Sequence, residues 1–301
     1  MPKKGKNMYK FLLPLLIFFF AGCAPEIEKK QQEQLPLWLS KHDSFHAVGS
    51  SKVNFQGIYT QRLEAINKAK SDLSHRVESY ISSVYQKESK TNGNSISTRI
   101  QNKVKSISNV FLKESYQVDA YIDAQRRLYV LVGISKAKVY NLFGDKTQLT
   151  SSKTHLPTLK TRPFDKKELM QSKCYSKNIL ETIDTKSDLY QNMPIWFFRP
   201  NQDGVVGSVG IAEKERGRSY TKQKSAAFIL AKSAISKRQK TEISSEYELY
   251  KILHGTVSGE NFETSSIVRS ATKVQEVVQK DIWLDPKSCE LYVWAIKKGQ
   301  H

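Results

Sequence analysis

Two aspartate pairs are the best candidates for acid–base chemistry in this sequence. Asp119 and Asp123 recur as Asp281 and Asp285, each pair spaced Asp-x-aromatic-x-Asp. Four residues on a strand place both carboxylates on one face but roughly 13 Å apart, too far for a carboxylate dyad. The second aspartate of each pair also borders a predicted turn, where aspartate is common for backbone reasons.

The other reactive side chains form no mutually supporting set. Ser50 and Ser208 lie near no duplicated histidine or acid that would complete a triad. The six histidines are scattered, and no cysteine or histidine cluster has metal-ligand spacing. We therefore predict no catalytic residues, no metal and no enzymatic activity. A hydrolase using Asp119 or Asp281 is the third reading, after the two described below.

The N-terminal stretch has the marks of an export signal. Four lysines precede the apolar run Phe11–Ala21, and small residues stand directly before Cys23. Such a run is too short to span a bilayer and is typical of a cleaved signal, here residues 1–22. The ending resembles the lipobox of bacterial lipoproteins, which implies a covalent lipid (palmitate) on Cys23. The alternative is an ordinary secreted protein with a chance cysteine at that place.

Lipoprotein sorting and surface charge point to the cell envelope. Ala24 follows Cys23 where the inner-membrane retention signal has aspartate, which by resemblance implies an outer-membrane, lipid-anchored protein in a Gram-negative source. Of 48 basic residues four belong to the signal, so the mature chain has 44 against 29 acidic residues, a balance of +15. A basic surface favours polyanions. Export makes nucleic acid an unsuitable partner and leaves lipid head groups, lipopolysaccharide, other envelope polymers or acidic proteins.

Two further cysteines remain after Cys23 is assigned to lipid. Cys174 and Cys289 lie far apart in the sequence. An exported chain can pair two spare thiols, and such a bond would tie the middle segment to the last hairpin. The sequence does not show whether their Cα atoms come close enough, so the disulfide stays open at this point.

The sequence repeats itself. A Pro-x-Trp motif and a Val-Gly-Ser motif around Trp38 and Gly49 recur around Trp196 and Gly207 at an offset of 158, and later matches share an offset of 162. We interpret this as two copies of one domain. The predicted organisation is a polar tether, a first copy, a linker of weak order with a helical part at 169–183, and a second copy: 23–34, 35–143, 144–192 and 193–298.

Each copy predicts the same elements. A short strand is followed by a long helix with an apolar stripe and then by an antiparallel pair, which is an α+β domain with the helix packed on the sheet. The stripes comprise Leu63, Ile66, Ala69, Leu73, Val77 and Ile81 in the first copy, and Ala227, Leu230, Ala231, Ala234 and Ile235 in the second. The polar stretches 87–97 and 254–266 are typical of loops or frayed edge strands.

The repeated tryptophans and glycines have structural explanations. We expect Trp38 and Trp196 to anchor the core at the domain entry, because buried aromatic rings mostly supply packing area. Gly49 and Gly207 are expected to serve a turn or a close backbone approach. Neither copy has the glycine-rich run opening a helix that a phosphate-binding loop requires.

The ordered motifs carry a family resemblance. Pro-x-Trp, Val-Gly-Ser, an alanine-rich helix, Asp-x-aromatic-x-Asp and Leu-Tyr-Val resemble the LPP20 family of bacterial lipoproteins, which includes a flagellar assembly lipoprotein. Members generally have one such domain, so the second copy departs from the pattern. The resemblance implies an envelope or assembly role without known catalytic residues.

Two functional hypotheses follow. The first is a non-enzymatic outer-membrane lipoprotein, on the periplasmic or the surface face, that assembles with copies of itself or with envelope machinery such as the flagellar motor. Unpaired edge strands could template that association. The alternative is a basic module that binds lipopolysaccharide or another anionic envelope polymer, and high salt would weaken only this second kind of binding.

Overall fold

The fold is seen in a computed structural model, which describes residues 35–40, 43–91, 98–135, 156–217, 219–254 and 276–298. The chain divides into two compact units, Met1–Leu35 and Pro36–His301, and the second is described below. The predicted signal peptide, Cys23 and the tether lie outside the described residues. Within the described part, no helix is both long and apolar enough to span a membrane.

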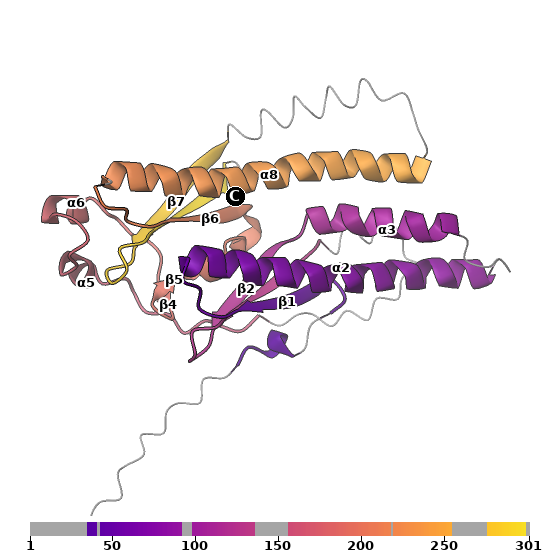
Figure 1. The fold of residues 1–301 in the computed structure, drawn as a ribbon, viewed down its shortest axis with the longest axis horizontal. Coiled ribbons are helices and arrows are strands. Elements are labelled where there is room, and N and C mark those ends of the chain that lie inside the picture. Colours follow the sequence, from indigo (N-terminus) through magenta and orange to yellow (C-terminus); the bar gives the residue numbers. More distant parts are fainter. Residues whose placement is uncertain are drawn as a thin grey trace, which may run out of the picture. The chain divides into compact units, whose positions relative to one another are not determined.

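The first half of the larger unit is a three-stranded antiparallel sheet with helices on one face (Figure 1). Its strands lie in the order β1-β3-β2, and β2 has a bulge between Gln117 and Asp119. The elements are η2 (Leu37–Leu39), β1 (His46–Ser51), α2 (Gly57–Thr91), α3 (Thr98–Lys113), β2 (Tyr116–Ile122) and β3 (Leu128–Gly133).

The second half repeats this arrangement. Its strands lie in the order β6-β8-β7, and β7 has a bulge between Gln279 and Asp281. The elements are β4 (Leu189–Tyr190), β5 (Met193–Pro194), α7 (Ile195–Phe198), η4 (Gln202–Gly204), β6 (Gly207–Ala212), α8 (Tyr220–His254), β7 (Val277–Leu284) and β8 (Leu291–Lys297). The fold is therefore α+β as predicted, and the duplication that would explain the likeness stays an interpretation.

The long helices bury a narrow stripe with a spacing of four residues. In α2 the stripe consists of small residues near β1 and larger ones beyond, namely Ala65, Ala69, Leu73, Val77 and Ile81. In α8 it comprises Ala227, Ala231 and Ile235. The prediction was wrong for Leu63, which is 40% exposed, and for Leu230 and Ala234, which are also exposed. These three lie off the stripe that faces the sheet.

A glycine lets each long helix approach its sheet. A Cβ on Gly49 would lie 2.0 Å from the Ala65 carbonyl oxygen, and a Cβ on Gly210 would lie 1.9 Å from that of Ala227. Gly49 pairs with Val130 and Gly210 with Val293, so the counterpart of Gly49 is Gly210. The predicted match with Gly207 was wrong, and neither glycine serves a turn, but the alternative of a close backbone approach is confirmed for both. Both Gly49 and Gly207 lie within strands, and Gly207 instead approaches the Pro200 carbonyl.

Helix boundaries and the connecting segment differ from the predictions. α2 continues to Thr91, and α3 occupies residues for which no helix was predicted. Residues 156–192 are not of weak order, because they contain α5 (Lys166–Met170), α6 (Lys177–Glu181) and β4, which pairs with β5, and they bury Leu169, Leu180 and Ile183. The helical part predicted at 169–183 is two short helices and not one. Residues 144–155 and 255–266 lie outside the described part.

The two halves share one core, to which the first half contributes its helices and the second half contributes the face of its sheet opposite to α8. The first sheet packs one face on α2 through Leu128, Val130 and Val132, while Trp38 covers the opposite face. In the second half, Leu291 and Val293 face the α8 side. The opposite face of the second sheet, with Tyr292 and Trp294, joins the core that contains α2 (Figure 1). The helix layer of the first half thus lies between the two sheets.

Candidate functional site

The repeated tryptophans and the repeated first aspartates bind one another. Trp38 Nε1 donates to Asp119 Oδ2 at 3.1 Å, and Trp196 Nε1 donates to Asp281 Oδ2 at 2.8 Å. All four residues are buried. The tryptophans are core anchors as expected. Their pairing with the aspartates was not predicted, because 81 and 85 residues separate the partners.

The strand bulges position both carboxylates. Each aspartate follows the irregular residue of its strand, and its Oδ1 accepts a hydrogen bond from the next backbone amide, Ala120 at 2.9 Å or Ile282 at 2.8 Å. A bulge turns a side chain away from the regular alternation of a strand. Asp119 and Asp281 therefore serve as acceptors that hold the entry segment of each half on its sheet.

The two carboxylates differ in their remaining partners. Arg199 donates to both oxygens of Asp119, at 3.0 and 2.9 Å, and so joins the second half to the first. Asp281 receives instead the backbone amides of Lys186 and Ser187, both at 3.1 Å. Burial raises the pKa of Asp119, and the hydrogen bond and charge of Arg199 oppose that rise.

The second aspartate of each pair organises a turn. Asp123 accepts from the Arg127 amide at 2.8 Å and from the Tyr129 hydroxyl at 3.2 Å. Asp285 accepts from the Lys287 amide at 2.9 Å and from the Ser288 hydroxyl at 2.8 Å. Neither carboxylate shares a partner with the first aspartate of its pair, so the structure brings no carboxylate dyad together at either place.

A matched pair of glutamines was missed by the sequence analysis. Gln61 Nε2 donates to the Ser51 and Arg126 carbonyls, and Gln223 Nε2 donates to the Ala212 and Cys289 carbonyls. Each glutamine thereby joins its helix to the end of the first strand and to a hairpin residue with positive φ. Identical glutamines 162 residues apart were a usable signal.

Cys174 and Cys289 form a disulfide with a Cα–Cα distance of 5.3 Å. The bond ties the segment between α5 and α6 to the turn before β8. Around it, Leu169, Leu180 and Ile183 pack against Leu284 and Leu291. The disulfide therefore holds the connecting segment against the second sheet.

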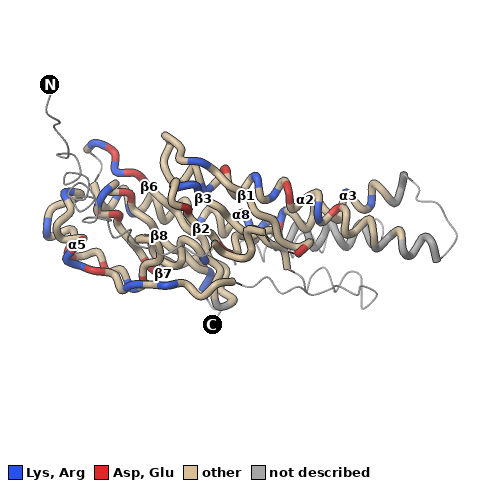
Figure 2. Tube along the Cα trace, turned by 90° about the horizontal axis from the view of Figure 1, so that it is seen from below, with Lys and Arg blue, Asp and Glu red and all other residues tan. Residues whose placement is uncertain are grey.

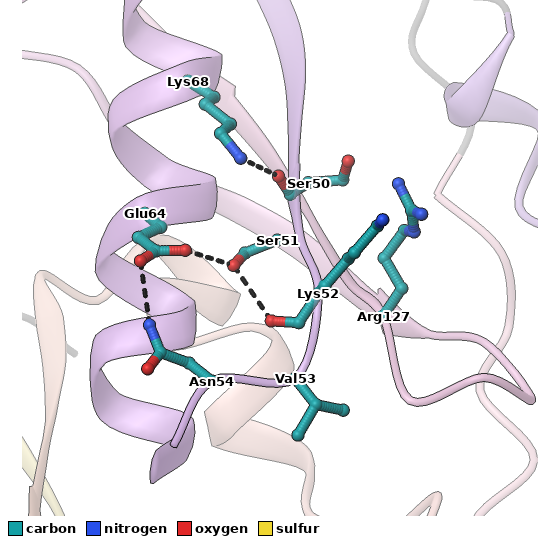
Figure 3. A pocket seen from close by; sticks show the side chains of 8 residues that line it. All are labelled: Ser50, Ser51, Lys52, Val53, Asn54, Glu64, Lys68 and Arg127. Atoms are coloured by element: carbon teal, nitrogen blue, oxygen red, sulfur yellow. Dashed lines mark hydrogen bonds between the residues drawn. The ribbon is translucent and has the colours of Figure 1, made fainter. Parts of the chain in front are cut away.

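A pocket of about 310 Å³ lies where β1 ends and α2 begins (Figure 3). Its lining comprises Ser50, Ser51, Lys52, Val53, Asn54, Glu64, Lys68 and Arg127. Both Glu64 oxygens accept from neutral groups, the Ser51 hydroxyl at 2.6 Å and the Asn54 amide at 2.8 Å. Lys68 donates to the Ser50 carbonyl at 3.1 Å. In Figure 3, Lys52 and Arg127 extend to the side of β1 away from α2.

Charge is reversed at the corresponding place in the second half. Lys52 and Arg127 flank the pair Ser51–Leu128, whereas Glu213 and Glu290 flank the matching pair Ala212–Leu291. Both glutamates lie at the N-terminus of α2, where a Cβ on Gly57 would be 2.9 Å from Glu213 Oε1 and 3.2 Å from Glu290 Oε1. Burial raises the pKa of Glu290. Elsewhere basic residues are spread over both halves (Figure 2).

Other predicted site residues stay apart. Ser208 lies on β6 opposite Ala295, and Ser50 lies on β1 opposite Tyr129. In the described ranges, no group of three histidine, cysteine, aspartate or glutamate side chains is arranged to hold a metal ion. Comparison with protein-family models and with curated proteins found no match for this chain.

Proposed function

We propose that this chain is a non-enzymatic lipoprotein of the outer membrane with a structural or assembly role in the cell envelope. The membrane anchor is supported by the N-terminal sequence that ends at Cys23, and the envelope role by the resemblance to LPP20 lipoproteins. An association with the flagellum is the narrower form of the proposal, and it rests on that resemblance alone.

The observation that carries the assembly role is the packing of two like units inside one chain. The face of the second sheet that carries Tyr292, together with Phe197 of α7, lies in one core with α2 of the first half. The two halves contact through unlike surfaces, which is a heterologous contact between two like domains. The domain thus associates with its own kind within the chain, and association between copies would use the edge strands.

Each sheet has two edge strands, and these differ in how far side chains occupy their free backbone groups. Gln191 exchanges hydrogen bonds with the Ile122 amide and carbonyl, and Asn201 donates to the Gln117 carbonyl, so side chains cover the β2 edge. Thr185 donates to the Ile282 carbonyl on the β7 edge. The opposite edge strands are β1 and β6, where side chains bind the strand ends, at Ser50 and Ser51 on β1 and at Gly207 and Ala212 on β6, so pairing would use the middle of each strand. We propose that these two strands carry any edge pairing between copies.

The non-enzymatic part of the proposal is supported by what the best candidate acids do. Asp119 and Asp281 are buried, and each accepts hydrogen bonds from a tryptophan and from backbone amides. These contacts give both carboxylates a structural role. Asp123 and Asp285 organise turns. A hydrolase reading would need one of these carboxylates to reach a substrate.

Light scattering on the mature chain without Cys23, at low and high salt, tests the assembly proposal. A stable oligomer in both conditions supports assembly through packed or edge-strand contacts. A monomer in both conditions contradicts self-association of the protein part. Separately, palmitate labelling of the full chain and of a Cys23→Ser variant tests the anchor, and equal labelling of both would contradict it.

A second candidate function is a basic module that binds an anionic envelope polymer such as lipopolysaccharide. The specific observation in its favour is that Lys52 and Arg127 form no ion pair with any residue in the described part of the chain. Binding of this kind should be lost above a few hundred millimolar salt, because salt screens exposed charges.

A further inference from the structure

The loop between β1 and α2 exposes apolar side chains beside cations. Phe55 is fully exposed and Val53 is 60% exposed, and Lys52 directly precedes them. Arg127 lies across the same pocket, next to the pairing of Ser51 with Leu128. We call Lys52, Val53, Phe55 and Arg127 the loop surface. Exposed aromatic and basic side chains together are typical of protein surfaces that lie on a membrane.

The cations of the loop surface are available to an external anion. Glu64 is the acid that lines the pocket, and both of its oxygens already accept from Ser51 and Asn54. The Asp123 carboxylate already accepts hydrogen bonds from the Arg127 amide and the Tyr129 hydroxyl. No ion pair therefore neutralises Lys52 or Arg127 within the described residues.

The fold does not require these residue types. In the second half, the places of Val53 and Phe55 after the strand are taken by Lys214 and Arg216, and those of Lys52 and Arg127 by glutamates. The second half keeps its strand, helix and hairpin with the opposite chemistry. The stability of the fold therefore does not explain why the loop surface is apolar and cationic.

The tether that would carry a membrane anchor joins the chain at the start of the first half. η2 packs Trp38 on the outer face of the first sheet, and Ser50, Arg127 and Tyr129 belong to strands of that sheet or flank them. If Cys23 carries lipid, the twelve-residue tether 23–34 spans at most about 43 Å. Leu35 must then lie within that distance of the lipid-bearing cysteine.

We propose that the loop surface docks on an anionic phospholipid bilayer, with Phe55 and Val53 entering the interface and Lys52 and Arg127 binding lipid phosphates. This docking rests on the proposed membrane anchor for its biological setting, but the binding itself does not need the lipid. Each cation near an anionic surface contributes about fivefold to partitioning, and a buried phenylalanine side chain about tenfold.

The test uses the mature chain, residues 23–301, with Cys23→Ser, and co-sedimentation with vesicles of phosphatidylglycerol or of phosphatidylcholine. We expect binding to phosphatidylglycerol and at least tenfold weaker binding to phosphatidylcholine. The double variant Lys52→Glu/Arg127→Glu should weaken binding at least 25-fold, roughly fivefold for each cation removed. Phe55→Ala should weaken it about tenfold.

Two control variants change side chains of the same kind outside the loop surface. Lys287→Glu changes an exposed cation of the second half, and Ile229→Ala changes an apolar side chain that is 63% exposed on α8. Both should bind like the parent chain. Equal loss in the controls, equal binding to both lipids, or binding to lipopolysaccharide micelles but not to phosphatidylglycerol would overturn the proposal. Palmitate labelling of the wild-type chain tests the anchor independently, so the two failures are distinguishable.

Discussion

The Arg199–Asp119 pair is predicted to be a principal link between the two halves. Arg199 donates to both oxygens of a carboxylate that is 1% exposed, and also to the Pro157 carbonyl at 2.7 Å. Arg199→Met leaves Asp119 buried with the Trp38 and Ala120 donors only. Breaking a buried pair from one side typically costs about 3–5 kcal/mol, so we expect a loss of about 3 kcal/mol at pH 7.

The pH dependence of that loss follows from the pKa of Asp119. Burial holds this pKa above the ordinary value of 3.8, and Arg199 opposes the rise. An acid with a raised pKa in the folded state contributes stability that is present below its unfolded pKa and is lost as pH rises through the folded pKa. Removing Arg199 raises the folded pKa further. The difference between Arg199→Met and wild type should therefore be small at pH 4 and grow toward pH 7.

Urea unfolding followed by tryptophan fluorescence, at pH 4, 5.5 and 7, measures this difference. Arg162→Met is the control, because its partner Glu168 is 42% exposed and such surface pairs contribute roughly 1 kcal/mol or less. Asp119→Asn combined with Arg199→Met should remove the pH trend, since asparagine does not ionise. A loss for Arg199→Met that is below about 1 kcal/mol at pH 7, or equal at pH 4 and 7, would refute the reasoning.

Three further variants test the framework that the two halves share. Gly49→Ala should cost more than about 2 kcal/mol, because its Cβ would lie 2.0 Å from the Ala65 carbonyl, and urea unfolding against Val53→Ala checks this. Gln61→Leu leaves the buried Ser51 carbonyl and the part-buried Arg126 carbonyl without this donor and should cost about 2 kcal/mol in the same assay. Cys174→Ser opens a loop of 115 residues and should lower the free energy of unfolding by about 2–4 kcal/mol, an effect that reduction of the wild-type chain should reproduce.

Local patterns in the sequence were sufficient for the α+β class. The spacing of Ala69, Leu73, Val77 and Ile81 predicts the buried stripe of α2, and the alternation before Asp123 predicts β2. α3 was missed although Val104, Ile107 and Phe111 have helical spacing and are buried. The spacing of these three residues was therefore a usable signal for a helix at this place.

Features that depend on distant contacts could not be read from the sequence. Nothing local indicates that Trp38 binds Asp119, since the contact depends on the bulge in β2 and on the path of the entry segment. The Gly49–Gly207 match failed for a related reason. The segment between the tryptophan and the strand is three residues longer in the second half, so the glycine that meets the helix is Gly210.

The two halves have the same residue types where a helix contacts the backbone of its sheet. They differ in the charged residues at the ends of their strands. Gly49 and Gly210 allow the same helix approach, and Gln61 and Gln223 make the same bonds. The charges around them are reversed. Glu213 and Glu290 lie at the N-terminus of α2, where the helix dipole favours acids and disfavours cations.

Lys52 and Arg127 occupy the corresponding places in the first half. Because both are cations, a contact with a helix N-terminus would be unfavourable for them. If the first sheet of one chain packed on α8 of a second chain, as the second sheet packs on α2, these cations would lie near the start of that α8. Lys222 and Lys224 already lie there, in the first turns of α8. Like charges there would oppose the contact. The internal stacking is therefore expected to stop at two units. This expectation agrees with the two proposals made above, docking of the loop surface on an anionic bilayer and association between copies through the β1 and β6 edges.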